Sequence, residues 1–187
     1  MTGSRVHAGR GFALALGVAA VVLVADQLSK AAITAALGPG SGRTAITIVP
    51  NLLQLFYVEN TGAAFGIFQG GGAILTPLAV VVVAVLAIAF RRLIAESAWL
   101  SVALGLQFGG AIGNIVDRLH HGYVVDFITV PHWPTFNVAD SCITVGVIIL
   151  GVVLFLKDVS EPSDEAATPT VTRAGAPASD DSSNHAA

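Results

Sequence analysis

The chain has 187 residues, of which 54% are hydrophobic and only 11% are charged, and its mean hydropathy is +0.77. A soluble domain is about 25% charged, and a soluble fold of this length could not bury so much apolar surface, so the composition excludes the usual water-soluble classes and predicts an integral membrane protein. The net charge of −3 is too mild to indicate a charged partner.

Four apolar stretches are long enough to be transmembrane helices. A helix needs about 17–25 residues to cross the roughly 30 Å hydrocarbon core of a bilayer. The stretches cover residues 12–36, 73–90, 98–116 and 138–156. We therefore predict an α-helical integral membrane protein with a four-transmembrane-helix bundle.

The first stretch has a second interpretation, as a cleaved signal peptide, because Arg5 and Arg10 precede its apolar run. However, the run continues through Asp26 and Lys30, and no sharp small-residue cleavage site follows it. We expect it to be retained as a helix.

The connection at residues 37–72 is rich in β-branched and aromatic residues. They concentrate in residues 44–49 and 52–58, on either side of the turn signal Pro50-Asn51, which predicts a hairpin. Residues 123–130 also resemble a strand. Together these segments predict a small β-platform on the outer side of the helices.

Glycines place the third span at the centre of the bundle. Gly105, Gly109 and Gly113 recur every four residues and so share one face of a helix. Such a face lets the backbone of a neighbouring helix come close. We expect this helix to be packed between others.

Basic residues indicate the orientation of the helices in the membrane. The positive-inside rule places loops rich in Lys and Arg in the cytoplasm. They fall at the start of the chain, in the second connection and after the last span, at Arg5, Arg10, Arg91, Arg92 and Lys157. Both termini are therefore predicted to be cytoplasmic, with the two longer connections outside.

The composition changes after Lys157 to Ser, Pro, Ala, Thr and acidic residues. Such a segment buries too little apolar area to offset the entropy lost on ordering. Residues 1–157 are therefore predicted to form the transmembrane domain, and residues 158–187 a disordered acidic cytoplasmic tail.

Strongly polar residues gather at the predicted outer ends of the helices, although polar groups are costly near a bilayer. Asp26 and Lys30 share a helix face four residues apart, which suits a structural ion pair. Asn137 suits an N-cap that accepts from the backbone amide of Asp140. The other members of this group are Asn114, Asp117, Arg118, Asp126 and Ser141.

Asp126 is the only acid among the apolar residues of its predicted strand. Such an acid is expected either to have a buried partner or to take part in a reaction. The histidines that could bind a metal are His120, His121 and His132, but adjacent histidines on a surface loop are expected to be solvated, so no metal site is predicted. No glycine elbow precedes Ser141, and no histidine lies within the membrane as its base, so covalent catalysis is disfavoured. Cys142 is the only cysteine and is read as a small buried side chain. Paired carboxylates remain as the favoured chemistry.

Five short blocks in this order resemble the lipoprotein signal peptidases, also called signal peptidase II. The resemblance covers nearly all the chain except its ends. Cys142 and the acidic tail depart from the family pattern. The blocks are Asp-Gln-Leu-Ser-Lys at 26–30, Asn-Thr-Gly-Ala-Ala-Phe-Gly at 60–66, Gly-Ala-Ile-Gly-Asn-Ile-Val-Asp-Arg at 110–118, Val-Val-Asp-Phe at 124–127 and Phe-Asn-Val-Ala-Asp-Ser at 136–141.

The resemblance implies an aspartyl endopeptidase in which Asp126 and Asp140 are the catalytic dyad. It implies cleavage of diacylglyceryl-modified prolipoproteins just before their lipidated cysteine, with no metal and no cofactor. The residues that it implies bind substrate or brace the site are Asp26, Lys30, Asn60, Gly62, Asn114, Asp117, Arg118 and Asn137.

The expected location is the bacterial cytoplasmic (inner) membrane, with the active site near its outer face. The expected partners are lipidated prolipoproteins and membrane lipid, with no nucleic acid, and we expect a monomer. An alternative from a different class remains open: a non-enzymatic lipoprotein-binding or transport protein that uses the same polar cluster.

Three finer expectations concern the site. Asp140, in the first turn of a helix, is expected to act as the base, and Asp126, among apolar neighbours, as the acid. Phe65, Phe68 and Phe127 are expected to form apolar walls. The glycines at 70–72 are expected to act as a hinge for the platform.

Overall fold

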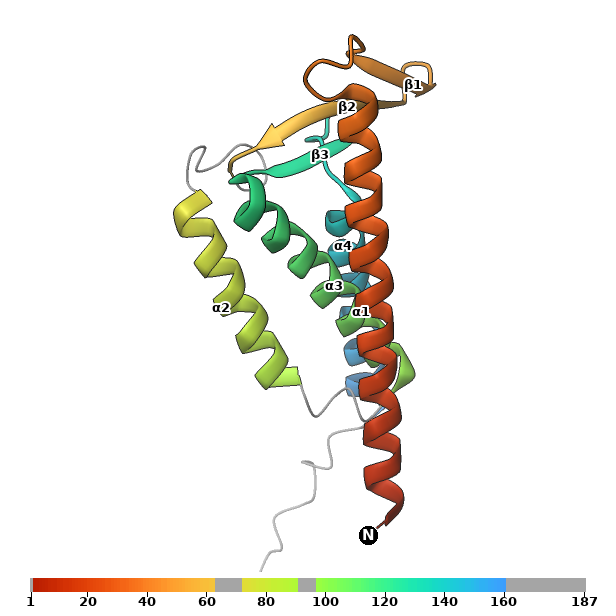
Figure 1. The fold of residues 1–187 in the computed structure, drawn as a ribbon. Coiled ribbons are helices and arrows are strands. Elements are labelled where there is room, and N and C mark those ends of the chain that lie inside the picture. Colours follow the sequence, from red (N-terminus) through yellow and green to blue (C-terminus); the bar gives the residue numbers. More distant parts are fainter. Residues whose placement is uncertain (1, 63–71, 91–96, 161–187) are drawn as a thin grey trace, which may run out of the picture.

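The structure, a computed structural model, describes residues 2–62, 72–90 and 97–160. Within these ranges the chain forms four helices and three strands (Figure 1). The helices run side by side, and the strands lie across one end of them. In chain order the elements are α1 (Thr2–Leu37), β1 (Ala45–Val49), β2 (Leu53–Asn60), α2 (Gly72–Phe90), α3 (Ala98–His121), β3 (Val124–Thr129) and α4 (Val138–Ser160).

Three of the described helices have the length and apolar character needed to cross a membrane. Their candidate spans are Gly9–Leu37, Ala98–His121 and Val138–Val159. These confirm three of the four predicted spans. In α2 the apolar segment Thr76–Ala89 is shorter than the other three, so its crossing of the membrane stays a prediction.

Helix α3 lies at the centre of the bundle, as its glycines predicted. Of its apolar span 56% is buried, against 17% for α1 and 11% for α4. A Cβ atom built on Gly105 would lie 2.6 Å from the carbonyl oxygen of Ala15, and one on Gly109 would lie 2.6 Å from that of Ala19. The glycine face therefore lets the backbone of α1 approach α3 more closely than any side chain would allow.

Helix ends extend beyond the apolar stretches that predicted them. Helix α3 continues through polar residues to His121, where Gly122 adopts a left-handed φ of 82° and its amide donates to Arg118 O at 3.0 Å. Helix α4 likewise continues to Ser160, beyond the predicted boundary at Lys157. Helical hydrogen bonding does not require apolar side chains, so hydropathy alone underestimates helix length. The rest of the predicted tail lies outside the described residues.

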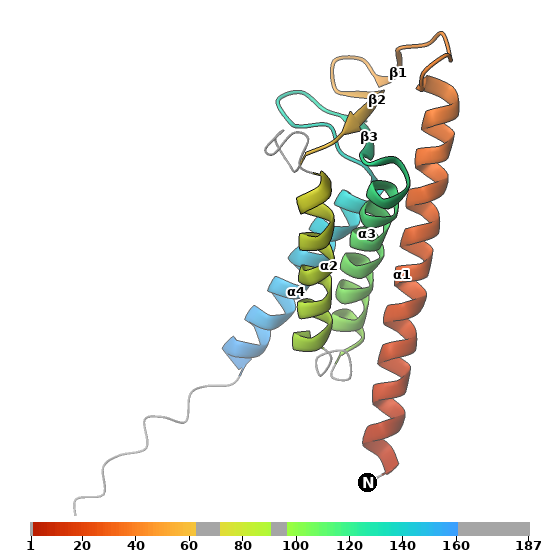
Figure 2. The same ribbon diagram turned by 60° about the vertical axis from the view of Figure 1, so that its left-hand side comes forward.

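The predicted hairpin and the third strand form one antiparallel sheet in the order β1-β2-β3. Asn51 turns the hairpin with a φ of 60°. Strand β2 continues past the end of β1 and pairs with β3, which places Val58 opposite Asp126 and Asn60 opposite Val124. The sheet forms a platform over the ends of α1 and α3 (Figure 2).

Phe127 belongs to the core beneath this platform and does not form the pocket wall that was expected. It is 5% exposed and packs with Ile33 and Leu37 at the end of α1. Successive residues of a strand point to opposite faces, so Phe127 faces away from Asp126. The other expected walls, Phe65 and Phe68, and residues 70–71 of the expected hinge lie outside the described residues.

We predict that Gly109→Ala lowers the free energy of unfolding by about 1–3 kcal/mol, because its Cβ must push α1 away from α3. Gly17→Ala is the matched control, since a Cβ there meets no atom within 4 Å, and it should change stability little or add up to about 1 kcal/mol. Thermal unfolding in detergent measures both. Equal effects would show that the close approach of α1 does not constrain position 109.

Candidate active site

The structure brings all ten predicted site residues into one hydrogen-bonded network at the sheet end of the bundle. They come from α1, from β2 and the residues after it, from α3, from β3 and from the start of α4. Most are buried, although their side chains are polar or charged. They are Asp26, Lys30, Asn60, Gly62, Asn114, Asp117, Arg118, Asp126, Asn137 and Asp140.

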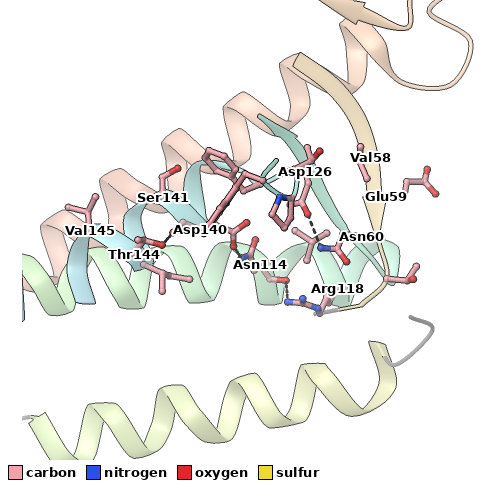
Figure 3. A pocket seen from close by; sticks show the side chains of 17 residues that line it. Val58, Glu59, Asn60, Asn114, Arg118, Asp126, Asp140, Ser141, Thr144 and Val145 are labelled. Atoms are coloured by element: carbon pink, nitrogen blue, oxygen red, sulfur yellow. Dashed lines mark hydrogen bonds between the residues drawn. The ribbon is translucent and has the colours of Figure 1, made fainter. Parts of the chain in front are cut away.

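A pocket of about 810 Å³ opens beside this network (Figure 3). Asp126 and Asp140 both line it, together with Asn60, Asn114 and Arg118. Side chains of β2, the loop before α4 and the first turns of α4 complete its wall. Two carboxyl groups therefore face the same space.

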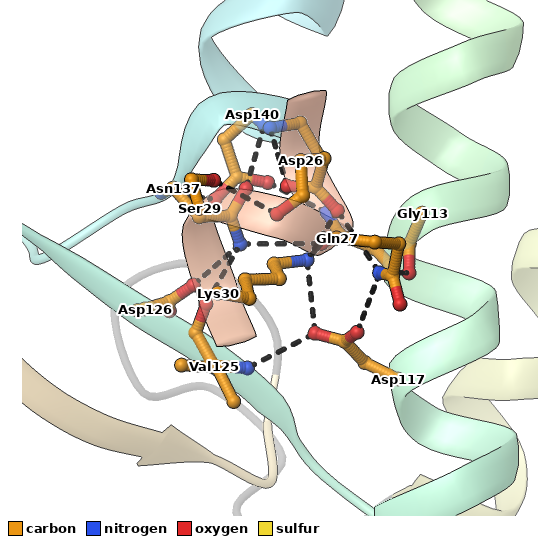
Figure 4. Close-up of polar contacts among 12 residues, drawn as sticks. Asp26, Gln27, Ser29, Lys30, Gly113, Asp117, Val125, Asp126, Asn137 and Asp140 are labelled. Carbon is orange, nitrogen blue, oxygen red and sulfur yellow. Dashed lines mark hydrogen bonds and ion pairs between the residues drawn. The ribbon is translucent and has the colours of Figure 1, made fainter. Parts of the chain in front are cut away.

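Lys30 occupies the centre of the buried side of the network (Figure 4). Its Nζ lies 2.8 Å from Asp26 Oδ2 and 2.9 Å from Asp117 Oδ2, and it donates to Asn114 Oδ1 at 3.0 Å. The predicted pair with Asp26 is confirmed. The second carboxylate, Asp117, uses its remaining acceptor positions for Gln27 Nε2 at 2.9 Å and Val125 N at 3.2 Å.

Gln27 is a site residue that sequence reasoning missed. Its Nε2 also lies 3.2 Å from Asp26 Oδ2 and 3.3 Å from Gly113 O, so it links α1 to α3. A signal was present, because an amide next to Asp26 within an apolar helix itself needs a partner.

Asn114 connects Lys30 to the pocket. An ammonium group can only donate hydrogen bonds, so Asn114 must turn its carbonyl oxygen toward Lys30 and its amide nitrogen away. That nitrogen donates to Asp140 Oδ1 at 2.8 Å. The buried ammonium thus determines which group faces the carboxylate of Asp140.

Asn137 caps α4 as predicted and also binds the second acid. Its Oδ1 accepts from Asp140 N at 2.9 Å, and its own backbone amide donates to Asp140 Oδ2 at 3.3 Å, which makes a reciprocal cap. Its Nδ2 donates to Asp126 Oδ1 at 2.7 Å. Asn137 therefore donates a hydrogen bond to the carboxyl group of each acid, from its side chain to Asp126 and from its backbone to Asp140.

Asp126 receives a second hydrogen bond from β2, where Asn60 Nδ2 donates to its Oδ2 at 2.8 Å. Burial raises the pKa of Asp126 to about 6, and the nearby charge of Asp140 adds to this rise, whereas the bonds from Asn60 and Asn137 and the charge of Lys30 oppose it. Asp126 therefore has buried partners, and its pKa is raised above that of an ordinary carboxyl group.

The residues after β2 are held by Arg118. Its Nη2 donates to Gly62 O at 3.2 Å and its Nη1 to Asn114 O at 3.4 Å. Gly62 N in turn donates to Asn60 Oδ1 at 3.0 Å. This fixes the amide orientation of Asn60, so that its nitrogen faces Asp126.

Other candidate chemistries find little support in this geometry. The hydroxyl of Ser141 donates to Asn137 O at 2.9 Å, and His120 and His121 are exposed at the end of α3. Within the described ranges no group of three or more His, Cys, Asp or Glu side chains is placed to hold a metal ion. The arrangement best suits acid–base chemistry by two carboxyl groups and a water molecule.

Comparisons with known proteins agree with this site. Residues 18–156 match the family described as Signal peptidase (SPase) II. The chain is 42% identical to the lipoprotein signal peptidase of Pseudomonas putida, over 82% of this chain and 94% of the relative. It is 40% identical to that of Moorella thermoacetica, over 71% of this chain and 87% of the relative.

The fold is similar to solved structures of bacterial membrane enzymes. One such structure matches with a TM-score of 0.71 at 28% identity, over 80% of this chain and 92% of the other. A second matches with a TM-score of 0.62 at 30% identity, over 77% and 93%.

We predict that Lys30→Met lowers the free energy of unfolding by about 3–5 kcal/mol, because it leaves two carboxylates buried without their cation. Arg43→Met is the matched control, since Arg43 is exposed, and it should change stability by less than about 0.5 kcal/mol. Thermal or denaturant unfolding in detergent compares them. If Lys30→Met were no less stable than Arg43→Met, the contacts of Lys30 with Asp26 and Asp117 would not stabilise the fold.

Proposed function

Because this chain belongs to the signal peptidase II family, whose members are bacterial membrane peptidases that remove signal peptides from prolipoproteins, we propose that it cuts diacylglyceryl-modified prolipoproteins just before the lipidated cysteine. Asp126 and Asp140 serve as its catalytic dyad. The observation that carries this proposal is that both acids line one pocket, each held by amide donors of the same network.

The proposed reaction needs one ionised and one protonated carboxyl group. Asp140 lies in the first turn of α4, near the positive end of the helix dipole, and accepts from Asn114 and from the backbone of Asn137. These contacts favour its role as the base. The raised pKa of Asp126 favours its role as the acid.

The steps balance without any further reactant. Asp140 takes a proton from water as the water oxygen bonds to the scissile carbonyl carbon, and Asp126 gives its proton to the carbonyl oxygen. The carbon–nitrogen bond of the resulting diol then breaks, the leaving nitrogen receives the proton held by Asp140, and the proton of one hydroxyl returns to Asp126. Both acids end in their starting states.

The position of the pocket suits a substrate anchored in lipid. A diacylglyceryl group holds the cysteine at the membrane surface, and the pocket lies where the apolar helices meet the sheet. Ile143 and Val145 of α4 give it an apolar side for acyl chains. We place the sheet at the outer face of the inner membrane.

Orientation and assembly follow from the same arrangement. Figure 2 shows the start of α1 and the end of α4 at the end of the bundle opposite the sheet. The basic residues Arg10 and Lys157 lie toward that end of the chain path, which supports cytoplasmic termini. A single copy supplies every residue of the network, which supports a monomer.

We predict that Asp126→Asn and Asp140→Asn each lower cleavage of a lipidated prolipoprotein by about 10³-fold or more, because an amide can neither take nor share the proton. Purified protein in detergent is incubated with the substrate, and the shortened product is quantified. Binding of the lipopeptide and the thermal unfolding temperature should be largely retained.

The Ser141→Ala variant separates this mechanism from a serine nucleophile and should still cleave. No cleavage by a folded wild-type sample, with binding intact, would favour a non-enzymatic lipoprotein-binding protein. Near-normal turnover by either Asp variant would exclude the dyad.

We predict that kcat/KM falls as the pH rises through about 6, because the protonated form of Asp126 predominates only below its raised pKa. The midpoint belongs to the coupled pair of acids. In Asn60→Ala the loss of a hydrogen bond to the carboxylate should raise that pKa further and move the midpoint to higher pH. A pH–rate profile of both proteins tests this, and a midpoint that moves to lower pH would reverse the acid assignment.

A further inference from the structure

The segment between β3 and α4 lines the pocket with large apolar side chains. They belong to Trp133, Pro134 and Phe136. None of these is one of the ten residues of the polar network, so this part of the pocket has no role in the proposed proton transfers. The segment ends at Asn137, the cap of α4, and is therefore joined directly to the helical turn that carries Asp140.

Backbone hydrogen bonds hold this segment against β3. Phe136 N donates to Ile128 O at 3.0 Å and Ile128 N donates to Phe136 O at 2.7 Å, which closes the segment in the manner of a hairpin. Within it Trp133 N donates to Val130 O at 3.3 Å, and His132 turns the chain with a φ of 63°. Trp133 therefore lies in a closed turn whose two ends are bonded to each other.

Trp133 is 59% exposed, although it lines the pocket. Single exposed apolar side chains are common in proteins, so exposure alone does not indicate a ligand. Here, however, the residue shares a pocket with Ile143 and Val145 of α4, which are also apolar. Covering such a surface is favourable for a ligand that has apolar groups of its own. More than half of the Trp133 surface is accessible to such a ligand.

The order of these side chains along the chain indicates how a lipid group fits. Asp140 lies in the first turn of α4, and Val145 lies more than one turn further along the helix (Figure 3). Trp133 precedes the helix and so lies on its sheet side. A diacylglyceryl group keeps its ester end at the membrane surface and its chains in the hydrocarbon. Its ester end therefore fits beside Trp133, at the depth where indole rings are enriched, and its chains fit beside Val145.

We infer that Trp133 binds the diacylglyceryl group of the substrate by packing its indole ring against the ester end of the acyl chains. The lipidated cysteine follows the scissile bond directly, so its glyceryl group must lie within one residue of the dyad. Trp133 thereby positions the residue that carries the lipid and contributes mainly to substrate binding. This inference rests on the proposed function and adds to it a residue that recognises the lipid.

The chain has two tryptophans, which allows a direct test by fluorescence. Trp99 is 65% exposed and lies in the first turn of α3, a helix of 24 residues and about 36 Å whose other end meets the sheet. In the Asp126→Asn background, which should bind substrate without cutting it, Trp99→Phe leaves Trp133 as the only emitter, and Trp133→Phe leaves Trp99. Each protein is titrated in detergent with a lipopeptide whose acyl chains carry bromine near the ester, because bromine quenches tryptophan emission at close contact.

We expect saturable loss of Trp133 emission and no saturable loss of Trp99 emission. The same lipopeptide without bromine controls for other effects of binding and should not quench. A phospholipid brominated at the same carbons controls for lipid in general and should quench Trp133 more weakly than the lipopeptide does. Equal quenching of Trp133 by that phospholipid would show that the ring contacts bulk lipid only, and would overturn the inference.

Kinetics of the otherwise wild-type enzyme give a second readout. Trp133→Ala should raise the KM for a lipidated prolipoprotein about tenfold and change kcat little, because the ring contacts the same group before and during the reaction. Trp133→Phe should recover part of this loss, and Trp99→Ala should leave KM unchanged. An unchanged KM in a folded Trp133→Ala variant would overturn the inference. The quenching experiment keeps Trp133 and so decides the question even if that variant fails to fold.

The outcomes separate this inference from the proposed function. Cleavage by the wild type without quenching of Trp133 overturns the role of Trp133 and keeps the peptidase. Equal quenching of Trp133 and Trp99 also overturns that role, because the lipopeptide would then have no preferred site near the pocket. Saturable quenching of Trp133 without cleavage by folded wild-type protein keeps the lipid contact but overturns the peptidase in favour of a lipoprotein-binding protein.

Discussion

The buried ammonium of Lys30 is the constraint on which the rest of the site depends. It has three protons and finds three acceptors, in Asp26, Asp117 and Asn114. These acceptors come from α1 and α3, so the two helices are joined at a fixed depth and rotation. Because Asn114 must offer its oxygen to Lys30, its nitrogen is left to hold Asp140. The contact between Lys30 and Asn114 therefore determines which atom of Asn114 faces Asp140 in the pocket.

The packing of the helices and the polar network require each other. Gly113 belongs to the face of α3 that touches α1, and a Cβ atom there would lie 2.5 Å from Asp26 Oδ2. The absence of a side chain leaves room for the carboxylate, whose Oδ1 accepts from Ala139 N of α4 at 3.0 Å. The carboxyl group of Asp26 thus pairs with Lys30 in the same helix and joins α1 to the first turn of α4. The glycine face of α3 therefore allows both the close packing of α1 and the position of the Asp26 carboxylate.

Much of this could be predicted from the sequence, where local chemistry decides the outcome. The hairpin, the glycine face of α3 and the cap formed by Asn137 each follow from spacing within a few residues. Asp117 as the second partner of Lys30 could not be found in this way, because that contact joins residues on different helices. Phe127 was wrongly expected in the pocket, although strand alternation places its side chain on the other face of β3 from that of Asp126.

The ion pair within α1 also matters for how the chain is made. Lys30 and Asn114 are 84 residues apart, so at about 5–20 residues per second roughly 4–17 s of synthesis separate them. For most of this interval α1 has been synthesised and α3 has not. Asp26, one helical turn from Lys30, is available from the start and neutralises the ammonium within the same helix. The ion pair of Asp26 and Lys30 later braces the finished site. During synthesis the same pair lowers the free-energy cost of placing α1 in the bilayer.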